Sequence, residues 1–355
     1  MRLEKVLKEM QKRQLTHLII NDPSSIDYLI NYKNNPGERM YLLLLSSDGH
    51  HKLFMNNLFY LDHELDIEQV WYSDTDNYLQ LLADEFDGAC SIGIDKNFPA
   101  RFLIPLMNLV DECHFELGSE CVDRVRMIKD EKEQQLMIEA SKINDLVVDE
   151  VINICAKGNL TEEEVSKQLE GIYQKHGCVG NSFEPIVAYG KNGADNHHSG
   201  DDSRLKAGDS IVIDIGGLYK GYCSDMTRTV FYKEVSPKQK TVYELVLKAQ
   251  KAAEAMIKPG VRLCDIDKCA RDIIAEGGYT VEFNHRLGHF IGRDVHEWCD
   301  VSQNFDLEVQ EGMTFSIEPG VYLEGDFGVR VEDLVMVTQD GCQVLNSFTK
   351  DIYII

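Results

Sequence analysis

Four carboxylates and one imidazole in the later part of the chain are of the types that bind metal ions: Asp214, Asp225, His289, Glu318 and Glu332. The two aspartates belong to DIGGLYKGYCSD, which predicts a β-hairpin with its tip at residues 219–220. In that hairpin Asp214 lies opposite Asp225, on the same face and about 5 Å away. The segment EPGVYLEGDFGVRVE repeats the arrangement around Gly325, so that Glu318 faces Glu332. Each hairpin is therefore expected to supply one acidic pair.

Pairs of like charge on neighbouring strands destabilise a sheet, so the four carboxylates need a counter-charge. A pair of divalent metal ions is the simplest candidate, because metals about 3.5–4 Å apart also hold a shared water and lower its pKa. Oxygen ligands with a single imidazole suit manganese, iron, cobalt or zinc in such a centre better than structural zinc or a calcium loop. The residues alone leave two hypotheses open. One is this metal site, and in the other the acidic side chains are solvated and His289 is a core histidine.

Composition excludes several classes of partner. The 355 residues carry a formal net charge of −24, whereas nucleic-acid and anionic-membrane binding needs clustered Lys and Arg. The longest apolar stretch is far short of the roughly 20 residues that span a bilayer. The charged start MRLEKVLKEMQKR is unlike a signal peptide, and the ten scattered cysteines indicate thiols in a reducing compartment. We therefore expect a cytoplasmic protein with no nucleic-acid or membrane partner.

The order of predicted elements divides the chain in two. Residues 1–125 alternate helix signals with apolar strand signals at 17–20, 40–45 and 52–55, as in a small α/β domain. From residue 126 onward, two helices precede the first acidic hairpin and two more precede the second. This order indicates an internal duplication, although the two halves are not visibly similar in sequence.

The motifs around the five residues resemble those of the pita-bread metallopeptidases: VIDIGGLYKGYCSDMTRTV, HRLGHFIGRDVHE, FSIEPGVYL and VRVEDLV. That family includes proline dipeptidases (prolidases), Xaa-Pro aminopeptidases and methionine aminopeptidases. The resemblance covers the whole chain and is greatest to bacterial proline dipeptidases. It implies an α/β (α+β) fold class: a small creatinase/prolidase-like α/β domain at 1–125, then a pita-bread catalytic domain at 126–355 with pseudo-twofold duplicated halves.

The resemblance also implies a role for each predicted ligand. Asp214 would be a terminal ligand of one metal, Asp225 and Glu332 would bridge both metals, and His289 and Glu318 would complete the second. A hydroxide bridging the metals would be the nucleophile, and Glu318 would relay its proton toward the leaving nitrogen. We expect two divalent ions per subunit, with manganese preferred over cobalt, iron or zinc.

Two further histidines resemble the pair that holds the scissile carbonyl and the tetrahedral intermediate in this family. They are His197, in YGKNGADNHHSG, and His296, in RDVHE. Uncharged donors aimed at a developing oxyanion contribute several kcal/mol each. His198 competes with His197 for that position, and the register favours His197, leaving His198 in a solvated loop. Asn196 stands where proline is frequent in the family.

A dipeptidase must also recognise the carboxylate of its short substrate, ideally with a guanidinium that makes two parallel bonds. Arg293 lies between His289 and His296 in sequence and is predicted to be that clamp, with an exposed loop arginine as the alternative. Arg330 lies close to Glu332 and is the second candidate, with orientation of that ligand as its other possible role. The apolar slot for proline is predicted to include three aromatic residues: Phe183, Tyr222 and Phe290.

The leading hypothesis is therefore metal-dependent hydrolysis of the Xaa-Pro bond in dipeptides, a small peptide with proline second being the substrate. An Xaa-Pro aminopeptidase acting on longer peptides is one alternative. A peptide- or protein-binding pita-bread protein without activity is another, which the five intact ligands disfavour. The family resemblance predicts a homodimer, and twofold-symmetric dimers are also the commonest soluble oligomers. In related dipeptidases the loop around residues 35–38 often carries an acidic residue and a histidine, whereas this chain has Asn35 and Gly37 there. The sequence therefore leaves open which residue is preferred before proline.

Overall fold

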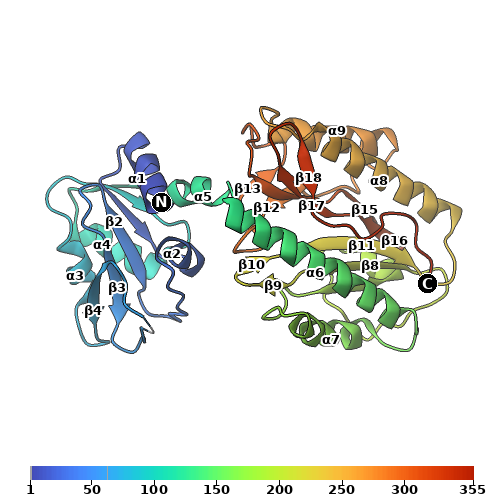
Figure 1. Cartoon of the computed structure of the whole chain (residues 1–355), viewed down its shortest axis with the longest axis horizontal. Coiled ribbons are helices and arrows are strands. Elements are labelled where there is room, and N and C mark those ends of the chain that lie inside the picture. The colour runs from blue at the N-terminus through green and yellow to red at the C-terminus, as the bar shows by residue number, and fades with distance from the viewer. Residues whose placement is uncertain (1, 62) are drawn as a thin grey trace. The chain divides into compact units, whose positions relative to one another are not determined.

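The structure is a computed structural model that describes residues 2–61 and 63–355. It divides into two compact units, one up to Arg126 and one over Met127–Ile355. Both contain helices and strands, in agreement with the predicted mixed fold class (Figure 1). None of the helices in the described part of the chain is both long enough and apolar enough to cross a bilayer.

The first unit is built on a six-stranded sheet with strand order β4-β3-β2-β1-β5-β6. One apolar cluster includes side chains of α1, α2 and α5, and a second includes side chains of α3 and α4, so both faces of the sheet are covered. The elements of this unit are α1 (Arg2–Lys12), β1 (His17–Ile20), α2 (Pro23–Ile30), β2 (Leu42–Ser46), β3 (Lys52–Asn56), β4 (Glu68–Tyr72), α3 (Tyr78–Ala83), β5 (Ser91–Ile94), α4 (Ala100–Leu109), β6 (His114–Leu117) and α5 (Glu120–Arg126).

The second unit contains two halves, each with a helix pair followed by strands, as the element order predicted. The first half has α6 (Glu131–Cys155), α7 (Glu162–Lys175), β7 (Ile186–Tyr189), the 3-10 helix η1 (Gly190–Ala194), β8 (Ser210–Ile215), β9 (Leu218–Tyr219), β10 (Tyr222–Cys223) and β11 (Met226–Phe231). The second half has α8 (Pro237–Met256), α9 (Leu263–Glu276), β12 (Gly288–Phe290), β13 (Glu297–Val301), β14 (Thr314–Ile317), β15 (Gly320–Leu323), β16 (Phe327–Arg330), β17 (Asp333–Val337) and β18 (Cys342–Val344).

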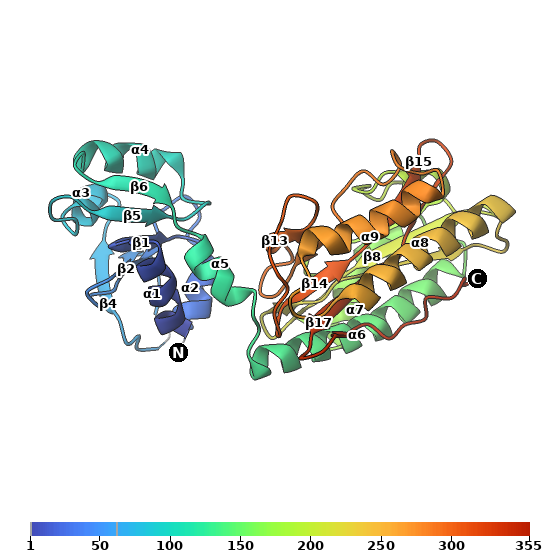
Figure 2. The same cartoon turned by 90° about the horizontal axis from the view of Figure 1, so that it is seen from above.

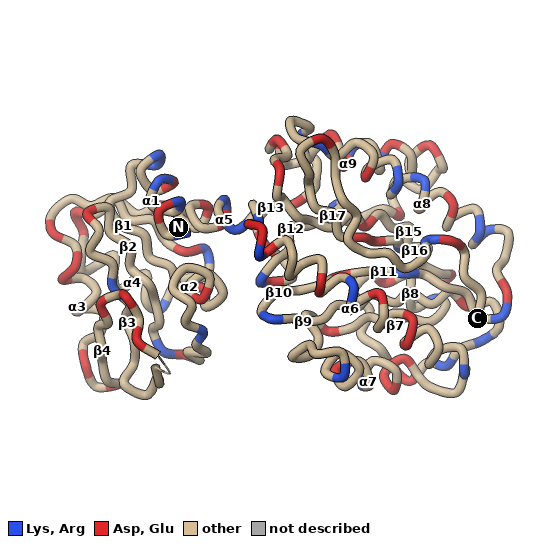
Figure 3. The backbone as a smooth tube through the Cα atoms, in the orientation of Figure 1, with Lys and Arg blue, Asp and Glu red and all other residues tan. Residues whose placement is uncertain are grey.

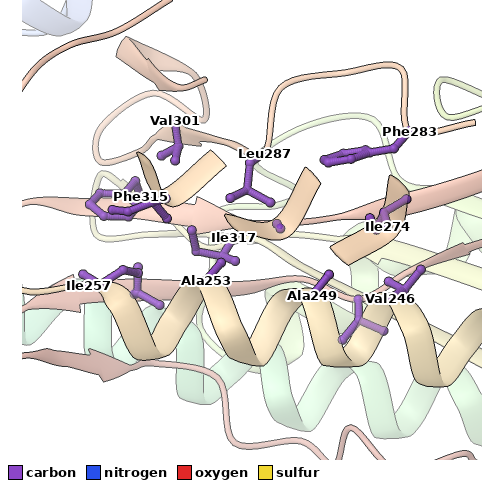
Figure 4. Packing of buried hydrophobic residues seen from close by; sticks show 14 of the residues in the cluster. Val246, Ala249, Ala253, Ile257, Ile274, Phe283, Leu287, Val301, Phe315 and Ile317 are labelled. Atoms are coloured by element: carbon purple, nitrogen blue, oxygen red, sulfur yellow. The ribbon is translucent and has the colours of Figure 1, made fainter. Parts of the chain in front are cut away.

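Each helix pair packs against the strands of its own half (Figure 2). Helices α6 and α7 share one apolar cluster with β7, β8 and β11. Helices α8 and α9 share another with β12, β14 and β17, which Figure 4 shows from close by. Val246, Ala249 and Ala253 of α8 recur at helical spacing and therefore lie on one face of the helix, toward Ile317, and Ile257 continues this row directly after the helix.

Capping residues set where the helices of this unit begin. Thr161 accepts a hydrogen bond from the backbone N–H of Glu164, whose side chain accepts the backbone N–H of Thr161, and the two residues form a capping box at the start of α7. Ser236 caps α8 in the same way with Gln239. Because these caps fix the helix ends, they also fix the segments that connect each helix to the site.

The second acidic hairpin has the predicted register. Gly320 pairs with Arg330 between β15 and β16, and Ile317 pairs with Asp333 between β14 and β17. Glu318 and Glu332 lie between these two ladders of common register and therefore face each other, as predicted.

The first acidic hairpin differs from its prediction by two residues. Asp214 pairs with Thr227, so that the position opposite Asp225 is Gly216. The turn is at residues 220–221, where Lys220 and Gly221 have φ values of 47° and 83°. A two-residue hairpin turn of this kind needs positive φ at both central positions, which glycine supplies without strain. A shift of two keeps Asp214 and Asp225 on one face, because side chains alternate with period two.

Charged residues are spread over both units, as Figure 3 shows, and acidic positions outnumber basic ones. The ten cysteines are all free thiols, as the sequence predicted.

Candidate active site

A cavity of about 570 Å³ in the second unit brings together residues from both halves. All five predicted metal ligands line it, together with the predicted residues His197, His296, Arg330 and Phe183. Its remaining lining residues are Glu184, Ile186, Asn196, His285, Arg286 and Val295. The volume lies in the range of small-molecule sites, about 300–1,000 Å³.

Strand ends position the ligand side chains. Asp214 is the penultimate residue of β8, and Asp225 directly precedes β11. Glu318 directly follows β14 and Glu332 directly precedes β17, while His289 is in the middle of β12. Each half of the unit thus contributes two carboxylates to one end of its sheet.

Three of these residues form a compact, buried group. Single ligand atoms of Asp225, His289 and Glu332 all lie within 4.8 Å of one another, and these residues are 1–4% exposed. His289 Nε2 is 3.4 Å from Asp225 Oδ2 and 3.4 Å from Glu318 Oε1. Its Nδ1 lies 3.2 Å from the carbonyl oxygen of Phe290, which places the proton on Nδ1 and leaves the lone pair of Nε2 facing the carboxylates.

The carboxylates of the site fit divalent metal ions. Buried carboxylate oxygens normally accept hydrogen bonds. Among the residues that the structure describes, Asp214 Oδ1, Asp225 Oδ1 and Glu332 Oε1 are buried without a hydrogen-bond donor. Each belongs to a predicted ligand and lines the same cavity. A hard cation is the partner that such oxygens lack.

The pKa values indicate the same need for positive charge. Burial raises the pKa of Asp225 well above its usual range, and the neighbouring Asp214 raises it further. Burial and the charge of Asp225 do the same to the pKa of Glu332, and burial raises the pKa of Glu318 to about 6. Carboxyl groups in this position favour protonation unless cations neutralise them.

Arg330 supplies one positive charge of the protein's own. Its Nη2 lies 2.6 Å from Asp214 Oδ2, and its Nε donates to Thr227 Oγ1 at 2.9 Å. Thr227 Oγ1 in turn donates to Glu332 Oε2 at 2.6 Å. Arg330 therefore orients ligands from both acidic pairs, which is the second of the two roles predicted for it.

The two histidines predicted to bind the oxyanion both line the cavity. The ring of His296 packs edge-on against that of His289, with centroids 4.4 Å apart. Burial lowers the pKa of His296 to about 4, so that it is neutral at physiological pH. His197 is exposed and lines the same cavity.

His198 differs from its predicted place in a solvated loop. Its side chain is 13% exposed, and its Nε2 lies 2.7 Å from Oε2 of the fully buried Glu162. Sequence could not reveal this contact, because His198 lies in a loop and its partner is 36 residues away on α7.

Three predicted substrate-binding residues lie elsewhere. The guanidinium of Arg293 is 5.7 Å from the ring centroid of Tyr222, and the cavity lining does not include it among the described residues. Tyr222 is buried and donates its hydroxyl to Glu133 at 2.8 Å. Phe290 belongs to the apolar core, where its ring centroid lies 5.2 Å from that of Phe315. These three residues therefore lie outside the cavity lining among the described residues, because nearness to His289 in sequence does not set the direction of a side chain.

Among the cavity residues that were not predicted as site residues, His285 and Arg286 both lie in the motif HRLGHFIGRDVHE. Arg286 is about one-third exposed, and its Nη1 lies 2.8 Å from Asp300 Oδ1. His285 Nδ1 lies 2.6 Å from the carbonyl oxygen of Arg286, and its Nε2 lies 3.0 Å from the Tyr322 hydroxyl. Spacing from His289 was the signal that could have identified them.

Comparison with known proteins connects this arrangement to a family. The model of metallopeptidase family M24 matches residues 135–339, and that of the creatinase/prolidase N-terminal domain matches residues 2–128. An Xaa-Pro dipeptidase of Pyrococcus horikoshii is 33% identical over 353 residues, 99% of this chain and 98% of that protein. YkvY of Bacillus subtilis, whose name marks it as a candidate dipeptidase, is 43% identical over 241 residues, 68% of this chain and 66% of that protein.

A solved structure is similar over the full length. The crystal structure of a recombinant prolidase from Thermococcus sibiricus superimposes with a TM-score of 0.94 at 31% identity, covering 100% of this chain and 98% of that one.

Proposed function

Because this chain belongs to metallopeptidase family M24, and is therefore a hydrolase, we propose that it cleaves the Xaa-Pro bond of dipeptides. The observation that supports this most directly is the single cavity that combines five candidate metal ligands, three further histidines and two arginines. A substrate pocket of about 570 Å³ suits a short peptide.

The residues that would hold two divalent ions are Asp214, Asp225, His289, Glu318 and Glu332, and manganese is the proposed metal. When bound, such ions supply a nucleophilic water of lowered pKa and polarise the scissile carbonyl. The buried oxygens that lack donors support this assignment independently of the family.

The chain's own residues would then divide the remaining work. Glu318 would take up the proton of the attacking water and pass it to the leaving nitrogen, which the 3.4 Å between its Oε1 and His289 Nε2 supports by keeping its carboxylate beside the other candidate ligands. His197 and the neutral His296 would donate hydrogen bonds to the developing oxyanion. Phe183 and Val295 would form the apolar wall against which a proline ring packs.

Recognition of the substrate carboxylate would fall to Arg286 rather than Arg293. Of the arginines that line the cavity, Arg330 is buried and paired with Asp214, whereas Arg286 is about one-third exposed. A guanidinium in that position can make two parallel bonds to a carboxylate. This replaces the carboxylate clamp expected from the sequence.

The test is proline release from a panel of peptides by protein reconstituted with Mn, Co, Fe or Zn. We expect rapid release from Ala-Pro and Leu-Pro and little cleavage of Ala-Ala. Bound metal is measured separately by elemental analysis. Absence of proline release with any metal, in protein that carries two ions, would contradict the proposal.

The same panel separates the alternative, an Xaa-Pro aminopeptidase. Ala-Pro-Ala places the carboxylate one residue further from the scissile bond, and Ala-Pro amide has no carboxylate. If Arg286 binds the carboxylate, Arg286→Met should raise KM for Ala-Pro and leave KM for Ala-Pro amide unchanged. Cleavage of Ala-Pro-Ala as fast as Ala-Pro would favour the aminopeptidase. A homodimer is also proposed, and light scattering on the purified protein tests it.

A further inference from the structure

The loop that carries His197 has little regular structure of its own. It connects β7 to β8, and its only helical portion is η1 at Gly190–Ala194. His197 itself is exposed, and its backbone N–H donates to Asp195 Oδ1 at 3.0 Å. A side chain that must meet a reacting carbonyl needs a firmer anchor than such a local turn provides.

Glu162 provides a buried anchor for this loop from the first turn of α7. Its side chain is 0% exposed. Oε1 accepts hydrogen bonds from the backbone N–H of Tyr189 at 2.6 Å and from Asn192 Nδ2 at 3.0 Å. Oε2 lies 2.7 Å from His198 Nε2 and accepts the backbone N–H of Asp201 at 3.1 Å. The Glu162 carboxylate thus accepts hydrogen bonds from residues that precede His197 in the sequence and from residues that follow it.

The backbone of the loop also lies directly against the start of α7. The N–H of Glu163 donates to the carbonyl oxygen of Asp201 at 3.1 Å. Gly200 allows this approach, because a Cβ there would lie 3.3 Å from the backbone of Glu162. The loop is therefore held at its far end by the same helix turn that holds its beginning.

His198 is the contact nearest to the catalytic position. Since the backbone N–H groups of Tyr189 and Asp201 show that the Glu162 carboxylate is an acceptor, Nε2 of His198 carries the proton in its hydrogen bond to Oε2. With His198 directed at Glu162, the adjacent His197 reaches the cavity instead. The orientation of one histidine thereby selects the orientation of the other.

A metal site is the competing explanation, since ligand atoms of Glu162, His198 and Asp201 lie within 4.8 Å of one another. However, both oxygens of Glu162 already accept backbone or amide N–H donors, which an ion would have to displace. The side chain of Asp201 likewise accepts the N–H of Ser203 at 2.7 Å. The group is complete without an ion.

We propose that Glu162 and His198 are positioning residues, which hold the loop so that His197 reaches the scissile carbonyl. The inference rests on the proposed function, because it assigns the loop's task to peptide hydrolysis. Neither residue touches the substrate in this account, and both act through His197.

The test uses His198, because removing Glu162 would leave several donors unpaired and risk the fold. His198→Leu removes the donor, whereas His198→Gln keeps an N–H at a similar distance. A misplacement of about 1 Å can cost about 100-fold in rate. For Ala-Pro we therefore expect kcat of His198→Leu to fall about 10- to 100-fold with little change in KM, and His198→Gln to recover most of that loss.

The chain offers a matched control at the other end of α7. His176 Nε2 lies 2.6 Å from Glu150 Oε1, in a histidine–glutamate pair like that of His198, and neither residue lines the cavity. His176→Leu should leave kcat unchanged. An equal loss of kcat in both leucine variants would mean a general effect on stability and would overturn the proposal.

A double-mutant cycle separates positioning from a structural role. In a His197→Ala background, His198→Leu should lower kcat by less than twofold, because the group that it positions is gone. A loss as large as in the wild-type background overturns the inference. Metal content, measured by elemental analysis, should be equal in all variants.

Hydrogen exchange distinguishes failure of this inference from failure of the proposed function. In His198→Leu, amides of residues 194–203 should exchange faster, and those of β8 and β11 should not. If the wild-type protein cleaves no Xaa-Pro peptide, the proposed function fails while this exchange pattern still reports the anchor. Unchanged exchange in the loop overturns the anchor whatever the substrate is.

Discussion

Arg330 and Asp214 form a buried ion pair at the edge of the ligand group, with Nη2 2.6 Å from Oδ2 and side-chain exposures of 4% and 13%. The guanidinium of Arg330 is thus one positive charge beside the four carboxylates of the candidate ligands. Without further cations the group would retain an excess of negative charge in a buried place, which agrees with the raised pKa values of Asp225 and Glu332. The protein therefore supplies only part of the positive charge that the site requires.

Arg330→Met should destabilise the metal-free protein by about 3 kcal/mol, because it leaves a buried carboxylate without its partner. The free energy of unfolding is measured in urea with EDTA present. Arg286→Met is the matched control, since its pair with Asp300 is about one-third exposed and should cost less than about 1 kcal/mol. Equal losses in the two variants would show that the buried pair is not special.

Asp225→Asn should have opposite effects with and without metal. The substitution removes a buried charge that raises the cost of folding when cations are absent, so the metal-free variant should be more stable than the wild type by about 1–3 kcal/mol. With manganese the order should reverse, because a candidate bridging ligand is lost. Thermal midpoints in EDTA and in Mn²⁺ check both signs, and elemental analysis should show fewer bound ions. A lower midpoint in EDTA would contradict this explanation.

Gly288→Ala should impair the site through the backbone. A Cβ at this position would overlap the carbonyl oxygen of Ser316, forcing β12 away from β14. Ser316 Oγ accepts the N–H of His289 at 3.0 Å and donates to Glu318 Oε1 at 3.1 Å, so both candidate ligands would move. We expect loss of metal binding and of stability by several kcal/mol.

The control for this variant is Gly171→Ala. Gly171 is an exposed residue inside α7, and a Cβ there meets nothing within 4 Å. Alanine should stabilise the helix by about 1 kcal/mol. Chemical unfolding of both variants gives the comparison, and retention of full metal content in Gly288→Ala would refute the predicted displacement.

The predictability of the acidic pairs from sequence differed between the two hairpins. The pairing of Glu318 with Glu332 followed from a register that is the same in two separate ladders, at Gly320–Arg330 and at Ile317–Asp333. For Asp214 and Asp225, symmetry about the tip gave a register two residues off, because positive φ at residues 220–221 moves the turn. Asp214 and Asp225 still lie on the same face of the sheet, because a shift of two residues preserves the alternation of side chains.

Contacts between distant segments were beyond sequence reasoning. Arg293 was predicted to reach the substrate, yet its backbone N–H donates to Glu297 Oε1 and its side chain lies near Tyr222. His198 was assigned to solvent, yet a carboxylate on α7 accepts its hydrogen bond. Local patterns specify elements and faces, whereas such pairings depend on how two elements pack.

His285 should make stability depend on pH in a predictable direction. Burial lowers its pKa from 6.5 to about 3, with nearby Arg330 as the next cause. Because the folded pKa lies below the unfolded one, the folded protein binds fewer protons in this window. Stability from this group is present above pH 6.5 and is lost as the pH falls toward the folded pKa, by up to about 1.4 kcal/mol per pH unit.

A variant that does not titrate isolates this contribution. In His285→Gln the amide still has a donor and an acceptor for the carbonyl of Arg286 and the hydroxyl of Tyr322, but it takes up no proton. The difference in unfolding free energy between wild type and variant, measured in urea between pH 7.5 and 4.5 with EDTA present, should shift against the wild type as the pH falls. The shift should begin near pH 6.5. A difference that stays constant across this range would mean that His285 is protonated equally in the folded and unfolded chains, and that its neutral hydrogen-bonded form is not part of the folded site.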